Sequence, residues 1–233
     1  MSNKSTVLLE HHLKELKLPT FLKEYDKVAS RCAAEGVDHP DYLLRLSELE
    51  LIDRNHRMVD RRIKAARFPT VKSLDTFDFL AIPSLNKALV LELARCEYID
   101  RKDNVIALGN SGTGKTHVAL GLGLAACQRG LSVGFTTAAA LVHELTEARD
   151  ERRLLNLQRK LASLKLLIID ELGFVPLSKT GPSCSSRSSA SAMNAARSWL
   201  PLTCHSTSGA RSLALNGSPG PSSTVSPTIS ISW

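Results

Sequence analysis

Eight consecutive residues in the middle of the chain have the types and order that bind nucleotide phosphates. They match the pattern G-x-x-x-x-G-K-[ST] and are Gly109, Asn110, Ser111, Gly112, Thr113, Gly114, Lys115 and Thr116. Glycines let backbone N–H groups turn toward a phosphate, and a helix start adds its positive end. We expect Lys115 to reach the β- and γ-phosphates and Thr116 to place its hydroxyl on Mg²⁺. The motif therefore predicts a site for ATP and magnesium.

Two adjacent carboxylates further along the chain could complete this chemistry. Asp170 and Glu171 directly follow an apolar run at 166–169. We expect Asp170 to hold Mg²⁺ through water and Glu171 to orient and activate the attacking water. Two solvated acids at a strand end are the alternative interpretation, and the upstream phosphate motif favours the catalytic one.

Strands and helices that alternate along the chain would position both motifs. After Asp103 the pattern predicts strands at 104–108, 132–136 and 166–169, with helices at 115–129 and 138–163. Alternating strands and helices indicate a parallel sheet with crossover helices. The phosphate motif then follows the first strand, and the carboxylates follow the third.

Residues 5–67 have a helical composition, and Pro19 and Pro40 are placed where new helices begin, so we predict three helices. One face of the third helix is apolar and is predicted to be core: Ile52, Val59, Ile63 and Ala66. Nearly opposite lies a basic stripe: Arg54, Arg57, Arg61 and Lys64. This stripe is either a solvated face or a surface that contacts DNA. Phe68 and Pro69 end the helix.

Residues 68–97 read as a linker followed by a helix at 85–95. Phe77 and Phe79 lie in the linker among Asp and Ser. We expect both rings to pack on the domain that follows.

The composition fits an intracellular globular protein. The chain has 233 residues, 43% of them hydrophobic, and a formal charge of +7, which fits an anionic partner without requiring one. Its five cysteines are scattered without a C-x-x-C pair, so neither a zinc site nor a disulfide framework is expected. The first 17 residues lack the apolar stretch of a signal peptide or a membrane span. We therefore expect a cytoplasmic protein without membrane contact.

Several segments together resemble the IstB-like ATP-binding proteins, which are AAA+ helper ATPases of insertion-sequence transposition related to DnaC-type helicase loaders. The resemblance rests on the segments at 74–79, 109–116, 135–141 and 167–177, and it extends to about Gly181. It implies an α/β P-loop NTPase with a three-layer parallel sheet, preceded by a small all-α domain. It also implies ATP-dependent assembly of several copies on DNA, without sequence preference, and recruitment of a transposase. A DnaC-like helicase loader and a non-enzymatic DNA-binding remnant are the alternatives.

The last part of the chain departs from this family. Beyond Lys179 there is no Asp, Glu or Lys, and Ser, Pro and Ala dominate without helical or strand periodicity. Segments 182–196, 203–209 and 216–228 can each be back-translated so that one neighbouring frame encodes family-like sequence, with the same shift in all three. We therefore predict a single-base deletion near the Gly181 codon and a disordered, out-of-frame tail.

Loss of the family sequence after the third strand has a structural consequence. In AAA+ proteins the fourth strand lies between the first and the third, so we expect a gap in the middle of the sheet. The lost part would also carry a polar sensor residue and the arginines that complete a neighbour's site. Hydrolysis is then not expected even where ATP binds, and we predict a poorly folded, inactive product. The predicted domains are 1–67 (helical), 68–97 (linker and helix), 98–181 (ATPase core) and 182–233 (tail).

Overall fold

The structure, a computed structural model, describes residues 2–171, 203–207 and 228–232. The chain divides into two compact units, Met1–Arg61 and Arg62–Trp233. Among the helices in these described ranges, none is long and apolar enough to cross a membrane.

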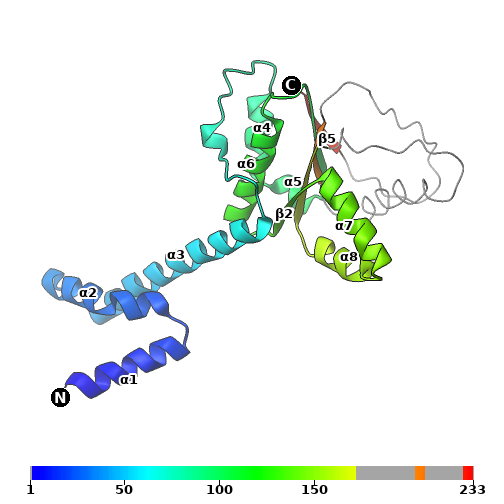
Figure 1. The fold of residues 1–233 in the computed structure, drawn as a ribbon. Coiled ribbons are helices and arrows are strands. Elements are labelled where there is room, and N and C mark those ends of the chain that lie inside the picture. Colours follow the sequence, from blue (N-terminus) through cyan, green and yellow to red (C-terminus); the bar gives the residue numbers. More distant parts are fainter. Residues whose placement is uncertain (1, 172–202, 208–227, 233) are drawn as a thin grey trace, which may run out of the picture. The chain divides into compact units, whose positions relative to one another are not determined.

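Three helices form the first unit: α1 (Ser2–Glu15), α2 (Pro19–Glu35) and α3 (His39–Ala66), the last of which continues into the second unit (Figure 1). The three predicted helices are thus confirmed, with Pro19 at the first position of α2. Gly36 ends α2 in the left-handed conformation, with φ at 67°. A small buried apolar cluster of this unit consists of Val28, Cys32 and Leu46.

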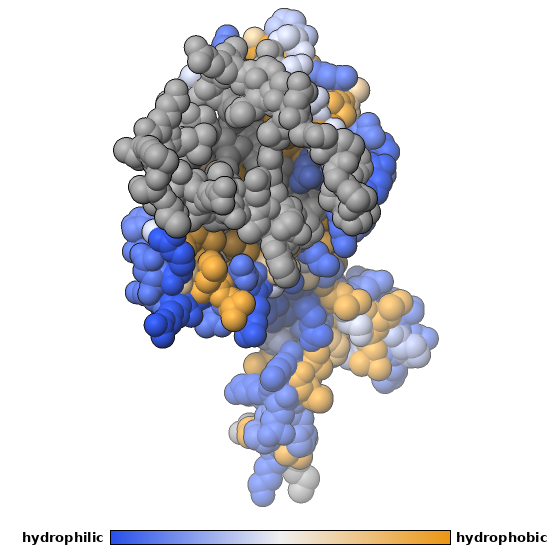
Figure 2. All heavy atoms as spheres, turned by 90° about the vertical axis from the view of Figure 1, so that its right-hand side faces the viewer, coloured by the Kyte–Doolittle hydropathy of each residue, from blue (hydrophilic) through white to orange (hydrophobic). Residues whose placement is uncertain are grey.

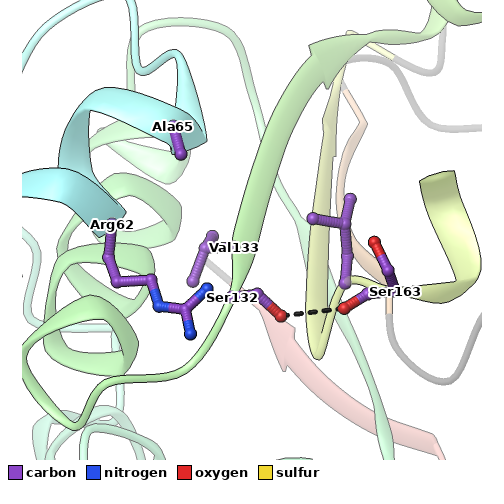
Figure 3. Close-up of a pocket in the computed structure, with 6 residues that line it drawn as sticks. Arg62, Ala65, Ser132, Val133 and Ser163 are labelled. Atoms are coloured by element: carbon purple, nitrogen blue, oxygen red, sulfur yellow. Dashed lines mark hydrogen bonds between the residues drawn. The ribbon is translucent and has the colours of Figure 1, made fainter. Parts of the chain in front are cut away.

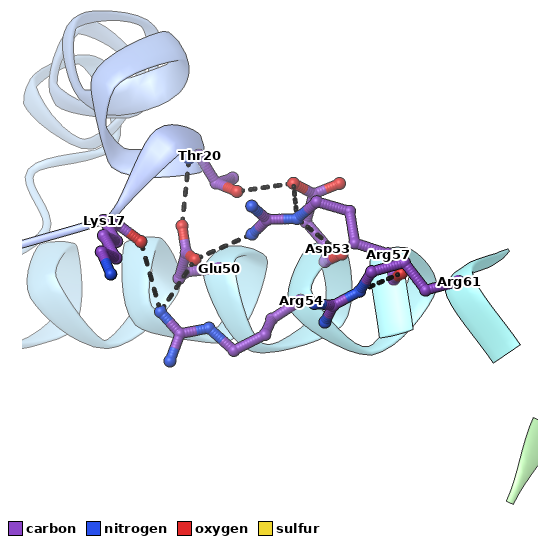
Figure 4. Close-up of polar contacts among 7 residues, drawn as sticks. All are labelled: Lys17, Thr20, Glu50, Asp53, Arg54, Arg57 and Arg61. Atoms are coloured by element: carbon purple, nitrogen blue, oxygen red, sulfur yellow. Dashed lines mark hydrogen bonds and ion pairs between the residues drawn. The ribbon is translucent and has the colours of Figure 1, made fainter. Parts of the chain in front are cut away.

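A buried carboxylate joins α3 to the start of α2 (Figure 4). Glu50 is 3% exposed and accepts hydrogen bonds from the Thr20 backbone N–H at 3.0 Å and from Arg57 at 3.0 Å. Thr20 donates its hydroxyl to Asp53 at 2.8 Å. Burial works against the charged form of Glu50, but the hydrogen bonds from Thr20 and the pairing with Arg57 outweigh it and lower its pKa. An anion at the first turn of α2 also complements the positive end of that helix.

The predicted faces of α3 need correction in its first part. Ile52 is 55% exposed, whereas Leu46 and Glu50 are buried. Leu46, Glu50 and Arg57 repeat at helical spacing, so the face with the predicted basic stripe is the one that packs on α2. Arg54 also pairs with Glu50, at 3.3 Å. Arg54 and Arg57 therefore pair, within α3, with the carboxylate that joins α3 to α2.

In its last turns α3 does place apolar residues inward, as the sequence predicts. Ala66 is 1% exposed and belongs to the core of the second unit, and Ile63 packs against that core. Val59 is half-buried. The helix ends at Ala66, before Phe68 and Pro69, as predicted.

The second unit contains a parallel five-stranded sheet. Its strand order is β2-β3-β4-β1-β5. The strands are β1 (Asn104–Leu108), β2 (Val133–Thr137), β3 (Leu166–Asp170), β4 (Thr203–Thr207) and β5 (Thr228–Ser232). The three strands predicted before residue 171 and their parallel arrangement are confirmed.

Helices cover both faces of this sheet (Figure 1). Leu166 and Ile168 of β3 belong to a core cluster with α6 (Lys115–Gln128), whereas Leu167 and Ile169 pack with α7 (Ala138–Asp150). Successive side chains of a strand point to opposite faces, so β3 contributes to two cores. The predicted three-layer α/β fold is confirmed.

The segment between α3 and β1, residues 67–103, is partly buried. It contains the 3-10 turn η1 (Leu74–Thr76) and two helices, α4 (Lys87–Leu93) and α5 (Glu97–Asp100). Asn86 begins α4 by accepting a hydrogen bond from the Leu89 N–H at 3.1 Å. The predicted helix at 85–95 and the predicted docking of Phe77 and Phe79 on the core are confirmed.

The single helix predicted over 138–163 is wrong, because the structure has two helices, α7 and α8 (Leu154–Ala162). Arg152 takes a left-handed backbone conformation, with φ at 56°. The Arg153 N–H bonds the Ala148 carbonyl oxygen at 2.7 Å, which closes the end of α7. The break lets Ala148 and Leu157 both be buried.

The expected gap in the sheet is also not found. Strand β4 lies between β1 and β3, with His205 opposite Ile106 on one side and Ile169 on the other. A missing strand between β1 and β3 would leave backbone N–H and C=O groups of both strands without hydrogen-bond partners. Backbone hydrogen bonds do not depend on side-chain identity, so an extended segment of almost any sequence can supply these partners. The tail was predicted to be disordered over 182–233, which is wrong for 203–207 and 228–232, because these segments pair with β1 as strands. The rest of the tail lies outside the described residues.

Candidate functional site

The loop between β1 and α6 has the backbone of a phosphate-binding turn. It runs from Gly109 to Gly114, directly after Leu108 and directly before the first residue of α6. Gly112 and Gly114 both have φ at 80°, a backbone conformation in which residues other than glycine are strained. The Thr113 hydroxyl donates to the Asn110 carbonyl oxygen at 2.9 Å and tightens the turn.

Lys115 is buried within this loop. Lys115 is only 5% exposed. Its Nζ donates to the Asn110 carbonyl oxygen and lies 3.5 Å from the Thr113 hydroxyl. Burial lowers the pKa of Lys115 below its ordinary value, while the nearby Asp170 carboxylate opposes that shift. A phosphate group at the loop would add negative charge that favours the charged ammonium.

Thr116 and Asp170 meet although 54 residues separate them. The Thr116 hydroxyl donates to Asp170 Oδ2 at 2.8 Å. Thr116 lies in the first turn of α6, and Asp170 is the last residue of β3 and is 8% exposed. Hydroxyl and carboxylate oxygens are the ligands that Mg²⁺ prefers.

Glu171 lies beside this pair with an exposed side chain. Its backbone N–H donates to Asp170 Oδ1 at 2.9 Å, so both oxygens of Asp170 accept a hydrogen bond. The backbone φ of Glu171 is 60°, a left-handed value that turns the chain directly after β3. Its predicted role as the residue that activates water stays a prediction.

These donors fit ATP with Mg²⁺. The loop offers backbone N–H groups at two glycines and the ammonium of Lys115, while Thr116 and Asp170 supply two hard oxygen atoms. The sequence thus predicted groups that the fold brings together at the carboxyl ends of β1 and β3. Gly109, Asn110 and Ser111 form the rest of the predicted loop, with Asn110 and Ser111 exposed.

Two residues at this loop were not predicted as part of the site. Phe77, predicted only to pack, lies against Gly114 of the loop, and His117, in the first turn of α6, packs against the Phe77 ring. Forty residues separate Phe77 from His117, and no periodicity pairs them. The one available signal was the small size of Gly114, next to which a large ring can lie.

A separate cavity lies at the other ends of the strands (Figure 3). Its volume is about 370 Å³, and its lining is Arg62, Ala65, Ser132, Val133, Ser163 and Leu164. Ser132 and Ser163 precede β2 and β3, whereas the phosphate loop follows β1. In a parallel sheet these positions are opposite edges, so this cavity is distinct from the phosphate loop.

A family model and individual relatives of this chain point to the same protein family. The family model of the IstB-like ATP binding protein matches residues 11–184. The ATP-binding protein described for insertion sequence IS5376 of Geobacillus stearothermophilus is 34% identical over 169 residues, which cover 72% of this chain and 67% of that protein. The corresponding protein described for IS21 of Pseudomonas aeruginosa is 33% identical over 171 residues, covering 73% and 64%. The chain spans about two thirds of the length of these relatives.

A solved structure supports the fold. The crystal structure of a DNA replication initiation factor has a TM-score of 0.50 and 18% identity, and the match covers 70% of this chain and 50% of that one. At this identity the likeness concerns the fold alone.

Proposed function

The chain belongs to the family of IstB-like ATP binding proteins, and from this membership we propose that it binds ATP with Mg²⁺ as a helper of insertion-sequence transposition. One observation carries the proposal. Thr116 and Asp170 are 2.8 Å apart beside the buried Lys115, at the start of α6 and the end of β3. This arrangement supports a site where a magnesium ion meets nucleotide phosphates.

Each predicted residue has a role in this proposal. The loop glycines present backbone N–H groups to the phosphates, and Lys115 neutralises the β- and γ-phosphates. Thr116 binds Mg²⁺ directly and Asp170 through water. In a chain that retains the residues for hydrolysis, Glu171 would orient the water that attacks the terminal phosphate.

The partners are those that membership of the family supports. We propose that ATP-bound copies assemble on DNA without sequence preference and recruit a transposase in the cytoplasm. Relatives described as insertion-sequence proteins support this role. If the proposal is right, ATP increases co-sedimentation of the chain with duplex DNA, and added salt weakens it. Equal co-sedimentation with and without ATP would count against assembly.

We also propose that this gene copy carries a single-base deletion near the Gly181 codon. The family match ends at residue 184, close to that codon. The copy would then bind ATP but lack the sensor and arginine residues for hydrolysis. Resequencing of the genomic DNA across the codon tests this directly, because a restored base would return the family sequence and with it the expectation of hydrolysis.

Binding of ATP itself is tested by titration of the full chain with a non-hydrolysable ATP analogue and Mg²⁺. Lys115→Ala should weaken binding about 10- to 100-fold, because a hydrogen bond to a charged group contributes roughly 1.5–3 kcal/mol. Lys165→Ala is the matched control, since Lys165 is exposed before the amino end of β3. Equal affinity for the unaltered chain and Lys115→Ala would contradict the proposed site.

A further inference from the structure

A segment from outside the ATPase motifs packs against the phosphate loop. Residues 73–79, here named the docking segment, contain η1 and lie before α4. Leu74 packs against Gly121 of α6, where an added Cβ would come within 2.7 Å of its side chain. The docking segment therefore lies along the first two turns of α6.

Phe77 contacts the loop itself. A Cβ on Gly114 would lie 2.7 Å from the Phe77 ring, so the ring occupies the space that a side chain would need. Phe77 is 9% exposed and packs edge-on against Phe79, with ring centroids 4.9 Å apart. Gly114 is the last loop residue before Lys115. The Phe77 ring restricts the positions that Gly114 can take.

His117 joins the docking segment to the first turn of α6. Its Nε2 lies 2.9 Å from the Ser73 carbonyl oxygen and 3.3 Å from the Thr76 hydroxyl. A carbonyl oxygen only accepts, so Nε2 carries the hydrogen. The ring also packs edge-on against Phe77 at 5.2 Å between centroids. His117 directly follows Thr116, the residue that pairs with Asp170.

We propose that Phe77 and His117 are positioning residues for the phosphate loop, and that docking of residues 73–79 sets the affinity for nucleotide. Phosphate binding needs several N–H groups held in one orientation, and a loop that is held in place before binding loses less freedom on binding. Phe77 acts through Gly114 and His117 through the first turn of α6. This inference rests on the proposed ATP binding.

The inference is tested by titrating full-length variants with the non-hydrolysable analogue, well below their unfolding temperatures. Phe77→Leu keeps an apolar side chain but loses the ring edge, and His117→Ala loses the donor to Ser73. We expect each to weaken binding about tenfold. His117→Gln should restore most of the affinity, because its amide N–H can reach the same carbonyl oxygen.

Two matched controls separate positioning from general stability. Phe68 packs on Gly123 of α6, where an added Cβ would be 3.0 Å from the Phe68 ring. Gly123 lies roughly 14 Å along the helix axis from Gly114. Phe68→Leu should therefore lower the thermal unfolding midpoint without changing affinity. His143→Ala changes a histidine whose side chain is 73% exposed and should change neither.

Hydrogen exchange on the unaltered chain gives a second, independent measurement. The Thr76 and Phe77 N–H groups bond within the docking segment, to Ser73 and Leu74, so their exchange requires the segment to open. Since coupling between sites is reciprocal, bound nucleotide should slow their exchange.

The outcomes distinguish this inference from the proposed function. Nucleotide binding with unchanged affinity in Phe77→Leu and His117→Ala, or with unchanged exchange at residues 76 and 77, overturns the positioning role alone. Equal weakening by Phe68→Leu reduces it to general stability and also overturns it. Failure of the unaltered chain to bind nucleotide contradicts both.

Discussion

At the scale of a single residue, we expect the Thr116 hydroxyl to make the affinity for nucleotide depend on Mg²⁺. Thr116→Val removes the oxygen that bonds Asp170 at 2.8 Å. We expect this variant to bind the ATP analogue equally weakly with and without Mg²⁺, because the ion loses its direct protein ligand. Lys115→Ala should differ, since it weakens binding but leaves the ratio of affinities with and without Mg²⁺ in place. Titrations at fixed ionic strength, with Mg²⁺ or with a chelator, measure these ratios.

Thr116→Ser is the control for this prediction. Serine keeps the hydroxyl at the same position and should retain the Mg²⁺ dependence of the unaltered chain. Retention of that dependence in Thr116→Val would show that Thr116 is not the metal ligand and that the Asp170 contact is structural only.

Glu50 makes the stability of the helical unit depend on pH. Its pKa is lowered in the folded chain, so its stabilising contribution is present above the pKa of the unfolded chain, near 4.3. The contribution is lost as the pH falls through the lower folded value. Glu50→Gln should cost about 1–3 kcal/mol at pH 7, because Arg54 and Arg57 lose their shared partner. Denaturant unfolding from pH 7 to pH 3 should show this difference shrinking with acid.

Glu48→Gln is the matched control for Glu50→Gln, since Glu48 is exposed on the same helix. It should change the unfolding free energy little at any pH. A constant difference between Glu50→Gln and the unaltered chain down to pH 3 would mean that the carboxylate charge is not what stabilises the unit.

The break between α7 and α8 predicts the sign of the change in unfolding free energy when Arg152 is replaced by glycine. Arg152 has φ at 56°, which costs a side-chain-bearing residue about 1–2 kcal/mol. Arg152→Gly should therefore stabilise the chain by about 0.5–1 kcal/mol in denaturant unfolding. Glycine inside one continuous helix would instead destabilise by roughly 1 kcal/mol. Arg149→Gly, within α7, is the control and should destabilise.

Elements with a clear period or a cap could be predicted from the sequence. Strand β1 matches its predicted bounds, and the first helix residue Lys115 follows directly from the phosphate motif. The α7–α8 break was missed because residues 150–153 are all charged, with neither Gly nor Pro to mark a turn. The inward face of α3 was missed because a buried carboxylate, Glu50, lies on it beside Leu46 and accepts the Thr20 N–H of α2.

The same limit applies to the candidate site. Lys115, Thr116 and Asp170 were predicted together because motif spacing in a parallel sheet brings strand ends to one edge. His117 and Phe77 were missed at the loop because their contact depends on how residues 73–79 dock, which no local pattern encodes. Tertiary packing decides these positions.

At the scale of the whole molecule, the positive charge is not in the helical unit. Residues 1–61 contain five Lys, five Arg, five Asp and six Glu, although the chain as a whole carries +7. Electrostatic attraction of DNA to this unit is therefore weak. Its surface instead shows apolar side chains (Figure 2). Val7, Leu51 and Ile52 are 55–62% exposed. Single exposed apolar side chains are normal on protein surfaces, so these residues do not by themselves indicate a partner.

The central strand of the sheet decides whether the second unit is cooperative as a whole. Without β4 and β5, strand β1 has no partner, and β2 and β3 remain as an isolated pair. A chain that stops at residue 181 should unfold on the order of 10 °C lower, since each 1 kcal/mol lost shifts the midpoint by roughly 2–4 °C at this size. His205→Pro keeps the length but removes one backbone N–H from β4 and should lower the midpoint less. Thermal unfolding of all three chains, monitored by circular dichroism, compares them. Identical midpoints would mean that β4 does not stabilise the sheet and that its centre is held by other contacts.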